Sequence, residues 1–215
     1  MGINVTPSKE TILKKIRQAL SDSTPLPFPQ SEGTQAIFQP SKQELELEFA
    51  EQFTKLNGKF AYCAGTAELK QQLGQLIVNL EWKKLYWREA SSALGRLLDE
   101  TIPSEIRSND LATCDASITS CECLVARTGS MLLSAALPSG RTSSVYAPVH
   151  ICIAYTSQLV YDVKDALVKV KEKYQGQMPS LISLATGPSR TADIEKTLVV
   201  GVHGPREVYC FLVED

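Results

Sequence analysis

Long apolar runs, paired cysteines and an excess of charge of one sign are all missing from this 215-residue sequence, and each absence excludes a class of protein. No apolar run approaches the roughly 18 residues that a membrane span needs. The 22 basic residues nearly balance the 24 acidic ones, which gives no long-range attraction to nucleic acid or to an acidic membrane. Charged residues such as Lys9 and Arg17 interrupt residues 1–22, where a secretory signal would be apolar. We therefore expect a cytoplasmic protein with a small-molecule ligand.

Histidine is also scarce, and the six cysteines show no Cys-x-x-Cys spacing. An iron–sulfur cluster is held by four ligands, usually cysteines in closely spaced runs, and a site built on His150 and His203 needs a carboxylate from a distant segment. We expect no metal and no cofactor bound by this chain. Several cysteines lie in apolar runs, as reduced core thiols do. His150 leads an apolar run and is expected at a strand start, whereas His203, between glycines, is expected to face a ligand.

The first forty residues differ in character from the rest of the chain. Apolar residues at helical spacing between positions 8 and 20, beneath a basic face, predict an amphipathic helix. Residues 24–30 alternate proline with apolar residues and can form neither a helix nor a central strand. We therefore divide the chain into an N-terminal helical arm (1–22), a proline-rich linker (23–40) and one domain (41–215). The arm folds back on the domain or docks on a second copy or on another protein.

The domain alternates strand-like and helix-like segments. Strands are expected at 59–64, 85–87, 116–119, 123–126, 131–135, 150–155, 181–185 and 208–213, and helices at 41–56, 66–80, 91–101 and 163–174. The alternation in the first third predicts a mostly parallel sheet with helices on both faces, that is, an α/β fold. Short connections in the middle third predict hairpins or loops at a sheet end.

The densest cluster of turn formers and reactive side chains lies between residues 186 and 206. The run 181–185 is short and apolar and is followed by Gly187-Pro188, which predicts a buried strand that ends in a sharp turn. Such a turn places hydroxyls, backbone N–H groups and a guanidinium at the carboxyl edge of a sheet, where open α/β folds bind ligands. A second polar turn at 202–206 precedes the last strand. Ordinary turns with solvated charges are the alternative interpretation.

We expect these two turns and the turn at 128–130 to meet in one anion-binding pocket. Arg190 and Arg206 would bind the anion, and Asp193 would hold a guanidinium or a ligand hydroxyl. The candidate acid–base residues are His203, Asp193 and Glu195. The candidate ligand-binding residues are Thr128, Gly129, Ser130, Gly187, Ser189, Arg190, Thr191, Gly204 and Arg206. A serine nucleophile is the lesser alternative, because neither Ser130 nor Ser189 has a base paired with it in the sequence.

Four motifs together resemble the lactate utilisation (LUD) domain family, and more narrowly its small single-domain protein C group. They are Thr128-Gly129-Ser130, Pro148 with His150, Gly-Pro-Ser-Arg-Thr-Ala-Asp-Ile-Glu at 187–195 and Gly-Val-His-Gly-Pro-Arg at 201–206. The resemblance implies a three-layer α/β sandwich with a Rossmann-like, mostly parallel sheet, similar to ribose-5-phosphate isomerase and the coenzyme A transferases. It also implies a part in the oxidation of L-lactate to pyruvate, with iron–sulfur clusters carried by partner iron–sulfur and cysteine-rich lactate utilisation subunits.

Arg127 departs from the pattern of the family. Relatives often have an acidic residue before the Thr-Gly-Ser step, and a carboxylate near there accepts the acyl group in the coenzyme A transferases. Covalent acyl transfer is therefore disfavoured, because Glu122 replaces this carboxylate only if the loop is remodelled. Arg127 is an anion clamp or a solvated edge residue, and we expect the second.

The expected function is that of a subunit of a cytoplasmic L-lactate oxidation system, with a small anionic metabolite bound at the carboxyl edge of the sheet. Two alternatives stay open. One is a stand-alone enzyme of sugar-phosphate isomerase or acyl/CoA-transfer type that uses His203, Asp193 or Glu195 as acid or base. The other is a non-catalytic assembly module that forms a homo-oligomer through its arm.

Overall fold

The computed structural model describes residues 7–21, 41, 43–88, 92–191, 199–201 and 203–215. The chain divides into two compact units, Met1–Gln39 and Pro40–Asp215. In the first unit, α1 (Pro7–Ser21) is the helix predicted from the apolar spacing, and its Ile12 and Ile16 side chains are exposed. None of the described helices is both long and apolar enough to cross a membrane.

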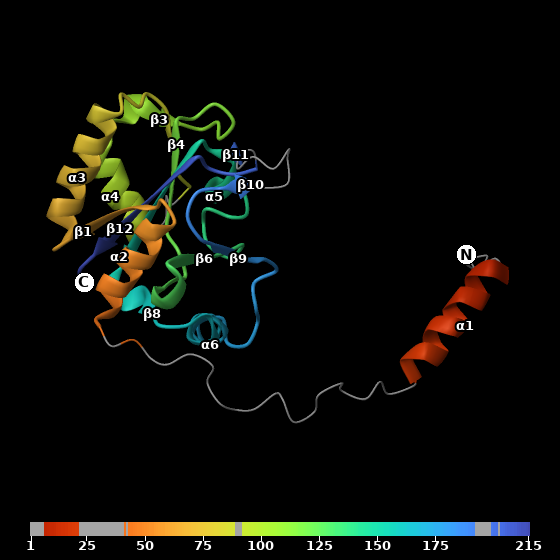
Figure 1. The fold of residues 1–215 in the computed structure, drawn as a ribbon. Helices are drawn as coiled ribbons and strands as arrows, with labels where there is room; N and C mark the ends of the chain where they lie inside the picture. Colours follow the sequence, from red (N-terminus) through yellow and green to blue (C-terminus); the bar gives the residue numbers. More distant parts are fainter. Residues whose placement is uncertain (1–6, 22–40, 42, 89–91, 192–198, 202) are drawn as a thin grey trace. The chain divides into compact units, whose positions relative to one another are not determined.

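A six-stranded parallel sheet forms the centre of the second unit, in the order β1-β12-β7-β4-β2-β3 (Figure 1). Its strands are β1 (Lys59–Cys63), β2 (Leu85–Tyr86), β3 (Arg107–Ser108), β4 (Ala116–Thr119), β7 (Val149–Tyr155) and β12 (Glu207–Val213). Because every neighbouring pair is parallel, the six amino ends lie at one edge of the sheet and the six carboxyl ends at the other. Strands β4, β7 and β12 are buried on both faces, which accounts for the long apolar runs of β7 and β12. The predicted α/β fold with a mostly parallel sheet is confirmed.

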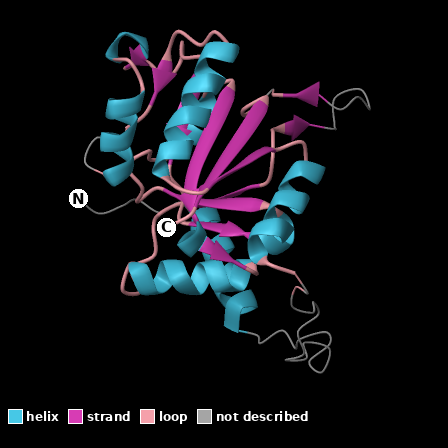
Figure 2. Ribbon diagram, turned by 90° about the vertical axis from the view of Figure 1, so that its left-hand side faces the viewer, coloured by secondary structure: helices cyan, strands magenta, loops and turns pink. Residues whose placement is uncertain are grey.

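Two helices, α3 (Thr66–Asn79) and α4 (Ala93–Thr101), cover one face of this sheet (Figure 2). Their inward residues recur at the predicted helical spacing and pack on alternate residues of the strands. This core cluster includes Leu69, Leu73, Ile77, Leu94, Leu97, Leu98, Ile118, Ile151, Ile153 and Phe211. Burial of such side chains, at about 25 cal/mol per Å² of apolar surface, holds these helices on the sheet.

The opposite face is covered by α2 (Leu45–Lys55) and by a second sheet of four strands. In order, these strands are β8 (Leu159–Val160), β5 (Cys123–Val125), β6 (Ser130–Ser134) and β9 (Ile182–Ala185). Phe49 and Phe53 of α2 and Met131 of β6 join Cys152 and Cys210 of the parallel sheet in a second core cluster. The outer face of the small sheet packs on α6 (Val163–Lys173), so four layers follow one another: helices, large sheet, small sheet with α2, and α6.

The second sheet was not expected, and it corrects one strand assignment. β5 and β6 form the predicted hairpin. The run 181–185, however, was predicted as a buried strand of the parallel sheet, and it instead pairs antiparallel with β6 at the edge of the small sheet, with Leu184 44% exposed. A short apolar run does not reveal which of two sheets it joins, because the pairing partner is distant in the sequence.

The remaining elements are short. They are α5 (Ser143–Tyr146), the antiparallel pair β10 (Arg190–Thr191) and β11 (Val199–Val200), and three 3-10 turns at Ser104–Ile106, Ala126–Thr128 and Thr156–Gln158. All six cysteines are free and buried, as expected of core thiols.

Candidate functional site

The turn at 201–206 leads into β12, and α5 with the residues after it leads into the neighbouring strand β7. The backbone N–H of Arg206 donates to the carbonyl oxygen of Pro148 at 2.8 Å, which joins the two entry segments. Both segments therefore lie at the amino edge of the parallel sheet. The expectation that this turn lies at the carboxyl edge was wrong. The turn precedes β12, and the sequence does not show whether β12 runs parallel or antiparallel to its neighbours; because it runs parallel, the turn lies at the amino edge.

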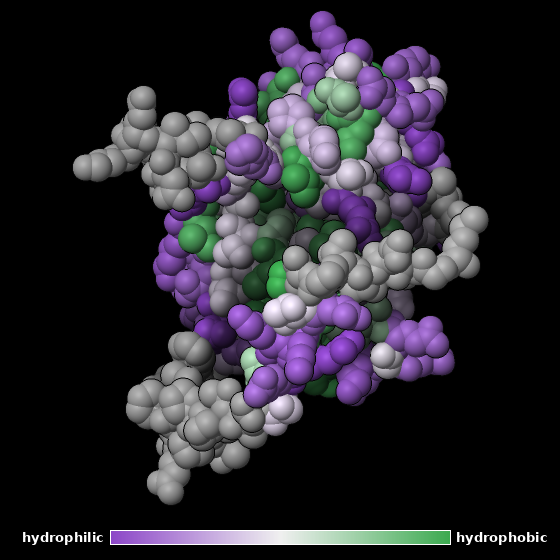
Figure 3. Space-filling model, turned by 90° about the vertical axis from the view of Figure 1, so that its right-hand side faces the viewer, coloured by the Kyte–Doolittle hydropathy of each residue, from purple (hydrophilic) through white to green (hydrophobic). Residues whose placement is uncertain are grey.

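A cavity of about 590 Å³ lies between these two segments. It is lined by Val145, Tyr146, Ala147, Pro148, Gly201, His203, Gly204 and Arg206. Two of these described lining residues are basic and none is acidic. Figure 3 is viewed from the side on which β10 and β11 lie, where hydrophobic surface is visible between hydrophilic residues. The composition suits an anionic ligand with an apolar part.

Two glycines shape the polar wall of the cavity. Gly201 has a φ of +80°, and a Cβ added to it would lie 2.1 Å from Cγ of Arg206, so the stem of this arginine packs directly on the glycine. A Cβ on Gly204 would lie 2.9 Å from Cβ of Ser189. The close approach of the Arg206 and Ser189 side chains to these two glycines depends on the absence of a Cβ at both positions.

Ser189 joins the two turns that were singled out from the sequence. Its N–H donates to the carbonyl oxygen of Pro205 at 2.9 Å, and its own carbonyl accepts from Gly201 at 3.0 Å. The prediction that the segments around 189 and 203–206 come together thus agrees with their geometry. Ser189 nevertheless stands behind the cavity wall, in contact with Gly204, rather than among the residues that line the cavity.

Three other predicted ligand-binding residues, Gly129, Gly187 and Arg190, lie against α2 and are not among the described residues that line the cavity. The Arg190 guanidinium donates to the carbonyl oxygen of Leu56, and a Cβ on Gly187 would lie 2.8 Å from the same oxygen. Gly129, with a φ of +59°, packs on the backbone of Phe53. Of the expected pocket, His203, Gly204 and Arg206 line this cavity.

The Thr128–Ser130 turn has a different neighbour. The buried Ser130 hydroxyl donates to Oγ1 of Thr128 at 2.8 Å and lies 2.8 Å from Oγ1 of the exposed Thr186, so the three hydroxyls are paired with one another. This turn fastens the start of β6 to the end of β9. Asp193 and Glu195, the candidate acid–base residues, lie outside the described residues, as does the side chain of Thr191.

His150 occupies the strand start that was predicted for it. Its imidazole is buried in β7, and Nε2 lies 2.8 Å from Oγ1 of Thr119 on β4. Burial lowers the pKa of His150 to about 4, because the charged form loses its hydration, so the ring is neutral near pH 7. Among the described residues no group of three or more His, Cys, Asp and Glu side chains is placed to hold a metal ion.

Arg127 is not the solvated edge residue that was expected. Its Nε lies 2.6 Å from Oδ2 of Asp162, and both side chains are largely buried, 22% and 28% exposed. Asp162 also accepts from the N–H of Lys164 at the start of α6, and this hydrogen bond together with the guanidinium holds the carboxyl pKa below its usual value. The pair fastens α6 to the 3-10 turn before β6. This role could not be predicted from the sequence, because the sequence does not show which helix packs beside the turn.

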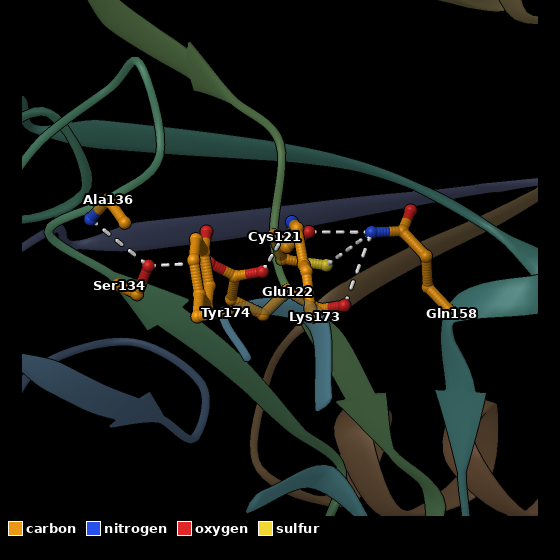
Figure 4. A network of polar contacts seen from close by, with 7 residues as sticks. All are labelled: Cys121, Glu122, Ser134, Ala136, Gln158, Lys173 and Tyr174. Atoms are coloured by element: carbon orange, nitrogen blue, oxygen red, sulfur yellow. Dashed lines mark hydrogen bonds and ion pairs between the residues drawn. The ribbon is translucent and has the colours of Figure 1, made fainter. Parts of the chain in front are cut away.

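Glu122 forms a buried polar network that nothing in the sequence indicated (Figure 4). Its carboxylate, fully buried, accepts hydrogen bonds from Ser134 at 2.5 Å, from the Tyr174 hydroxyl at 2.7 Å and from Lys173 Nζ at 2.7 Å. Burial by itself would raise the pKa of Glu122, but these three donors outweigh it and the pKa is lowered. A carboxylate held this way is not placed to accept an acyl group, which agrees with disfavoured covalent acyl transfer.

The sequence comparisons agree with the motifs. The LUD domain family matches residues 47–213. Lactate utilization protein C of Shouchella clausii is 36% identical over 102 residues, which are 47% of this chain and 44% of that protein. The protein of the same name in Bacillus subtilis is 35% identical over 103 residues, 47% of this chain and 43% of that protein. An uncharacterized protein of Neisseria meningitidis is 38% identical over 94 residues, 44% and 40% of the two chains. The matched segments thus span less than half of these relatives.

The fold is similar to that of a solved structure. The crystal structure of a DUF162 family protein from Deinococcus radiodurans superposes with a TM-score of 0.59 at 19% identity, covering 81% of this chain and 99% of that one. This likeness concerns the fold alone. The family match extends over most of the second unit, including both large-sheet strands that border the cavity. The chain therefore belongs to the LUD domain family.

Proposed function

We propose that this chain is a subunit of a cytoplasmic L-lactate oxidation system and that it binds an anionic ligand in the cavity between α5 and the turn before β12. The ligand is a small anionic metabolite or the anionic part of a cofactor. The name of the relatives, lactate utilization protein C, supports the lactate system. The fold and the residues that line the cavity support the proposal that the ligand is anionic.

The presence of both Arg206 and His203, with no acidic residue among the described residues that line the cavity, is the observation that carries this proposal. Glu207 is adjacent to Arg206 in sequence, but its carboxylate lies 2.6 Å from Lys59 Nζ on β1, on the side of β12 away from β7. Among the described residues no carboxylate forms an ion pair with the Arg206 guanidinium. A carboxylate or phosphate ligand there gains charge-assisted hydrogen bonds.

The remaining candidate residues have two proposed roles. His203 donates a hydrogen bond or carries a proton, with Asp193 and Glu195 as further acid–base candidates on the segment that leads to β11. Gly187, Ser189, Arg190 and the Thr128–Ser130 turn position the polar wall from behind, through α2 and β9.

The redox chemistry of lactate oxidation is proposed to lie in partner chains. Two-electron oxidation of an alcohol to a ketone needs an electron acceptor, and the cysteine spacing of this chain does not match that of iron–sulfur proteins. The proposed partners are the iron–sulfur and cysteine-rich lactate utilisation subunits, which carry the clusters. This chain supplies binding and orientation.

The test is a thermal-shift and calorimetric screen of the full chain against lactate, pyruvate, phosphosugars, nucleotides and coenzyme A. Arg206→Gln should weaken binding of every stabilising anion roughly 10- to 100-fold, the loss of one charge-assisted hydrogen bond. Arg96→Gln is the control, because it removes an exposed guanidinium from α4, on the opposite face of the large sheet. If Arg206→Gln binds all stabilising anions as the wild type does, the cavity is not the site. Turnover of a phosphosugar or acyl-CoA by the isolated chain would instead favour the stand-alone enzyme.

A further inference from the structure

The proposed cavity is larger and more apolar than a three-carbon acid requires. Its volume of about 590 Å³ lies within the roughly 300–1,000 Å³ range of sites that enclose drug-sized ligands. Half of its described lining residues form a continuous apolar stretch from Val145 to Pro148. If the carboxylate of lactate or pyruvate were bound at Arg206, the apolar stretch would remain exposed to water.

Tyr146 is the unusual member of the apolar wall. It is 69% exposed, and its neighbour Val145 is 41% exposed, although both line a cavity. Large aromatic side chains on soluble proteins usually bury more of their surface, and a flat exposed ring at the mouth of a basic cavity suits a stacking contact.

The backbone segments that carry Tyr146 and Arg206 lie close to one another. Arg206 is hydrogen-bonded to the carbonyl of Pro148, and Tyr146 lies only two residues before this proline, at most about 7 Å along the chain. The aromatic surface and the basic group thus border the same cavity from its two entry segments. One ligand of moderate size spans both.

We propose that the cavity takes a nucleoside phosphate, with its phosphate at Arg206 and His203 and its base stacked on Tyr146. This inference rests on the proposed anion site and deepens it by naming the ligand class. Base–aromatic stacking tolerates different bases, so the class is a nucleoside phosphate, free or as the end of a larger cofactor. Phosphate offers more acceptor oxygens than a single carboxylate to the guanidinium and imidazole.

Three probes separate the parts of the ligand in calorimetric titrations of the full chain. AMP carries both phosphate and base, ribose 5-phosphate carries only the phosphate end, and adenosine carries only the base end. AMP should bind at least tenfold more tightly than either fragment. A titration with NAD⁺ distinguishes the source: tighter binding than AMP indicates a larger cofactor, and weaker binding indicates a free mononucleotide.

Two variants assign each part of the ligand to its residue. Tyr146→Ala should weaken the binding of AMP roughly 5- to 100-fold, which is the range for the loss of one stacked base. Its affinity for ribose 5-phosphate should be unchanged. Arg206→Gln should weaken AMP and ribose 5-phosphate alike. Tyr62→Ala, at an exposed tyrosine on the outer strand β1, is the matched control and should bind AMP as the wild type does.

The outcomes separate this inference from the proposed function. If anions bind and depend on Arg206 while AMP is no tighter than ribose 5-phosphate and Tyr146→Ala has no effect, the nucleoside-phosphate inference is overturned and the anion site stands. If none of the probes binds and Arg206→Gln changes nothing in the wider screen, both fail. Because Tyr146 is exposed, melting temperatures of its variants should match the wild type, so lost binding is not lost folding.

Discussion

The guanidinium of Arg190 donates a hydrogen bond to the carbonyl oxygen of Leu56, the residue that ends α2. The last carbonyls of a helix lack intrahelical donors and carry partial negative charge, so a cation there stabilises the helix end. Arg190→Ala should therefore lower the free energy of unfolding by about 0.5–1.5 kcal/mol, measured by urea denaturation. Arg206→Ala, which leaves this helix end intact, should unfold nearly as the wild type does. A larger loss of stability in Arg206→Ala than in Arg190→Ala would contradict the assignment of Arg190 to the helix end.

Gly129, which precedes β6 of the small sheet, packs closely on the backbone of α2. Its φ is +59°, and an added Cβ would lie 2.4 Å from the backbone nitrogen of Phe53. Gly129→Ala should cost about 2–4 kcal/mol of stability, since it combines a left-handed strain with overpacking against backbone. Gly140 has a φ of +66° but open space around it, so Gly140→Ala should cost only about 1 kcal/mol. Equal melting temperatures for the two variants would contradict this account of α2 packing.

His150 should make stability depend on pH in the weakly acidic range. Burial lowers its pKa from 6.5 to about 4, so the unfolded chain takes up the proton more readily than the folded one. The resulting stability is fully present above about pH 6.5 and is lost as pH falls towards 4, by up to about 3 kcal/mol. His150→Gln, which keeps a hydrogen-bonding partner for Thr119, should flatten the stability profile between these values. Parallel profiles of wild type and variant would show that the ring is not neutral and buried.

Among the carboxylates of the domain, Glu122 should be the one whose substitution reduces folding stability most. Glu122→Gln removes the charge that Lys173 and Tyr174 face, and the amide cannot accept all three hydrogen bonds, so stability should fall by about 1–3 kcal/mol. Because the folded pKa of Glu122 is lowered, its contribution is present above about pH 4.5 and is lost below it; the variant should lack that part of the acid transition. Glu100→Gln, which breaks only the exposed pair with Lys70, should melt almost unchanged. A larger loss at Glu100 than at Glu122 would refute the buried network.

Residues 1–22 are expected to be dispensable for folding. All buried residues of the three core clusters lie between positions 49 and 213, so the second unit has a complete core of its own. A chain that begins at residue 23 should show a cooperative melt within a few degrees of the full chain, followed by circular dichroism. Sedimentation of both chains then tests whether the arm mediates association. An insoluble or molten truncated chain would place the arm in the core instead.

Local sequence patterns determined most elements of this protein. Two examples are α3, which is predicted by the helical spacing of Leu69 and Leu73, and β12, which is predicted by its unbroken apolar run. Both patterns can be found without tertiary information, because each reflects the repeat of a single element that buries its side chains in the core. The turn signals at Gly187-Pro188 and Gly204-Pro205 were also sufficient to find the segments that Ser189 joins. The family resemblance rested on these same turns.

Tertiary structure alone decided where the turns face. Residues 181–185 could pair with either sheet, and the direction of a parallel strand is invisible in its composition, so the amino-edge position of Arg206 followed only from the pairing of β12 with β7. Arg190 and Arg206 look equivalent in the sequence, yet one reaches a helix end and the other a cavity. The Glu122 network likewise joins residues more than fifty positions apart, whose contact depends on how α6 packs on β5 and β6. Long-range contacts of this kind carry no local period, which is the physical reason that the sequence determined the elements and the fold determined the site.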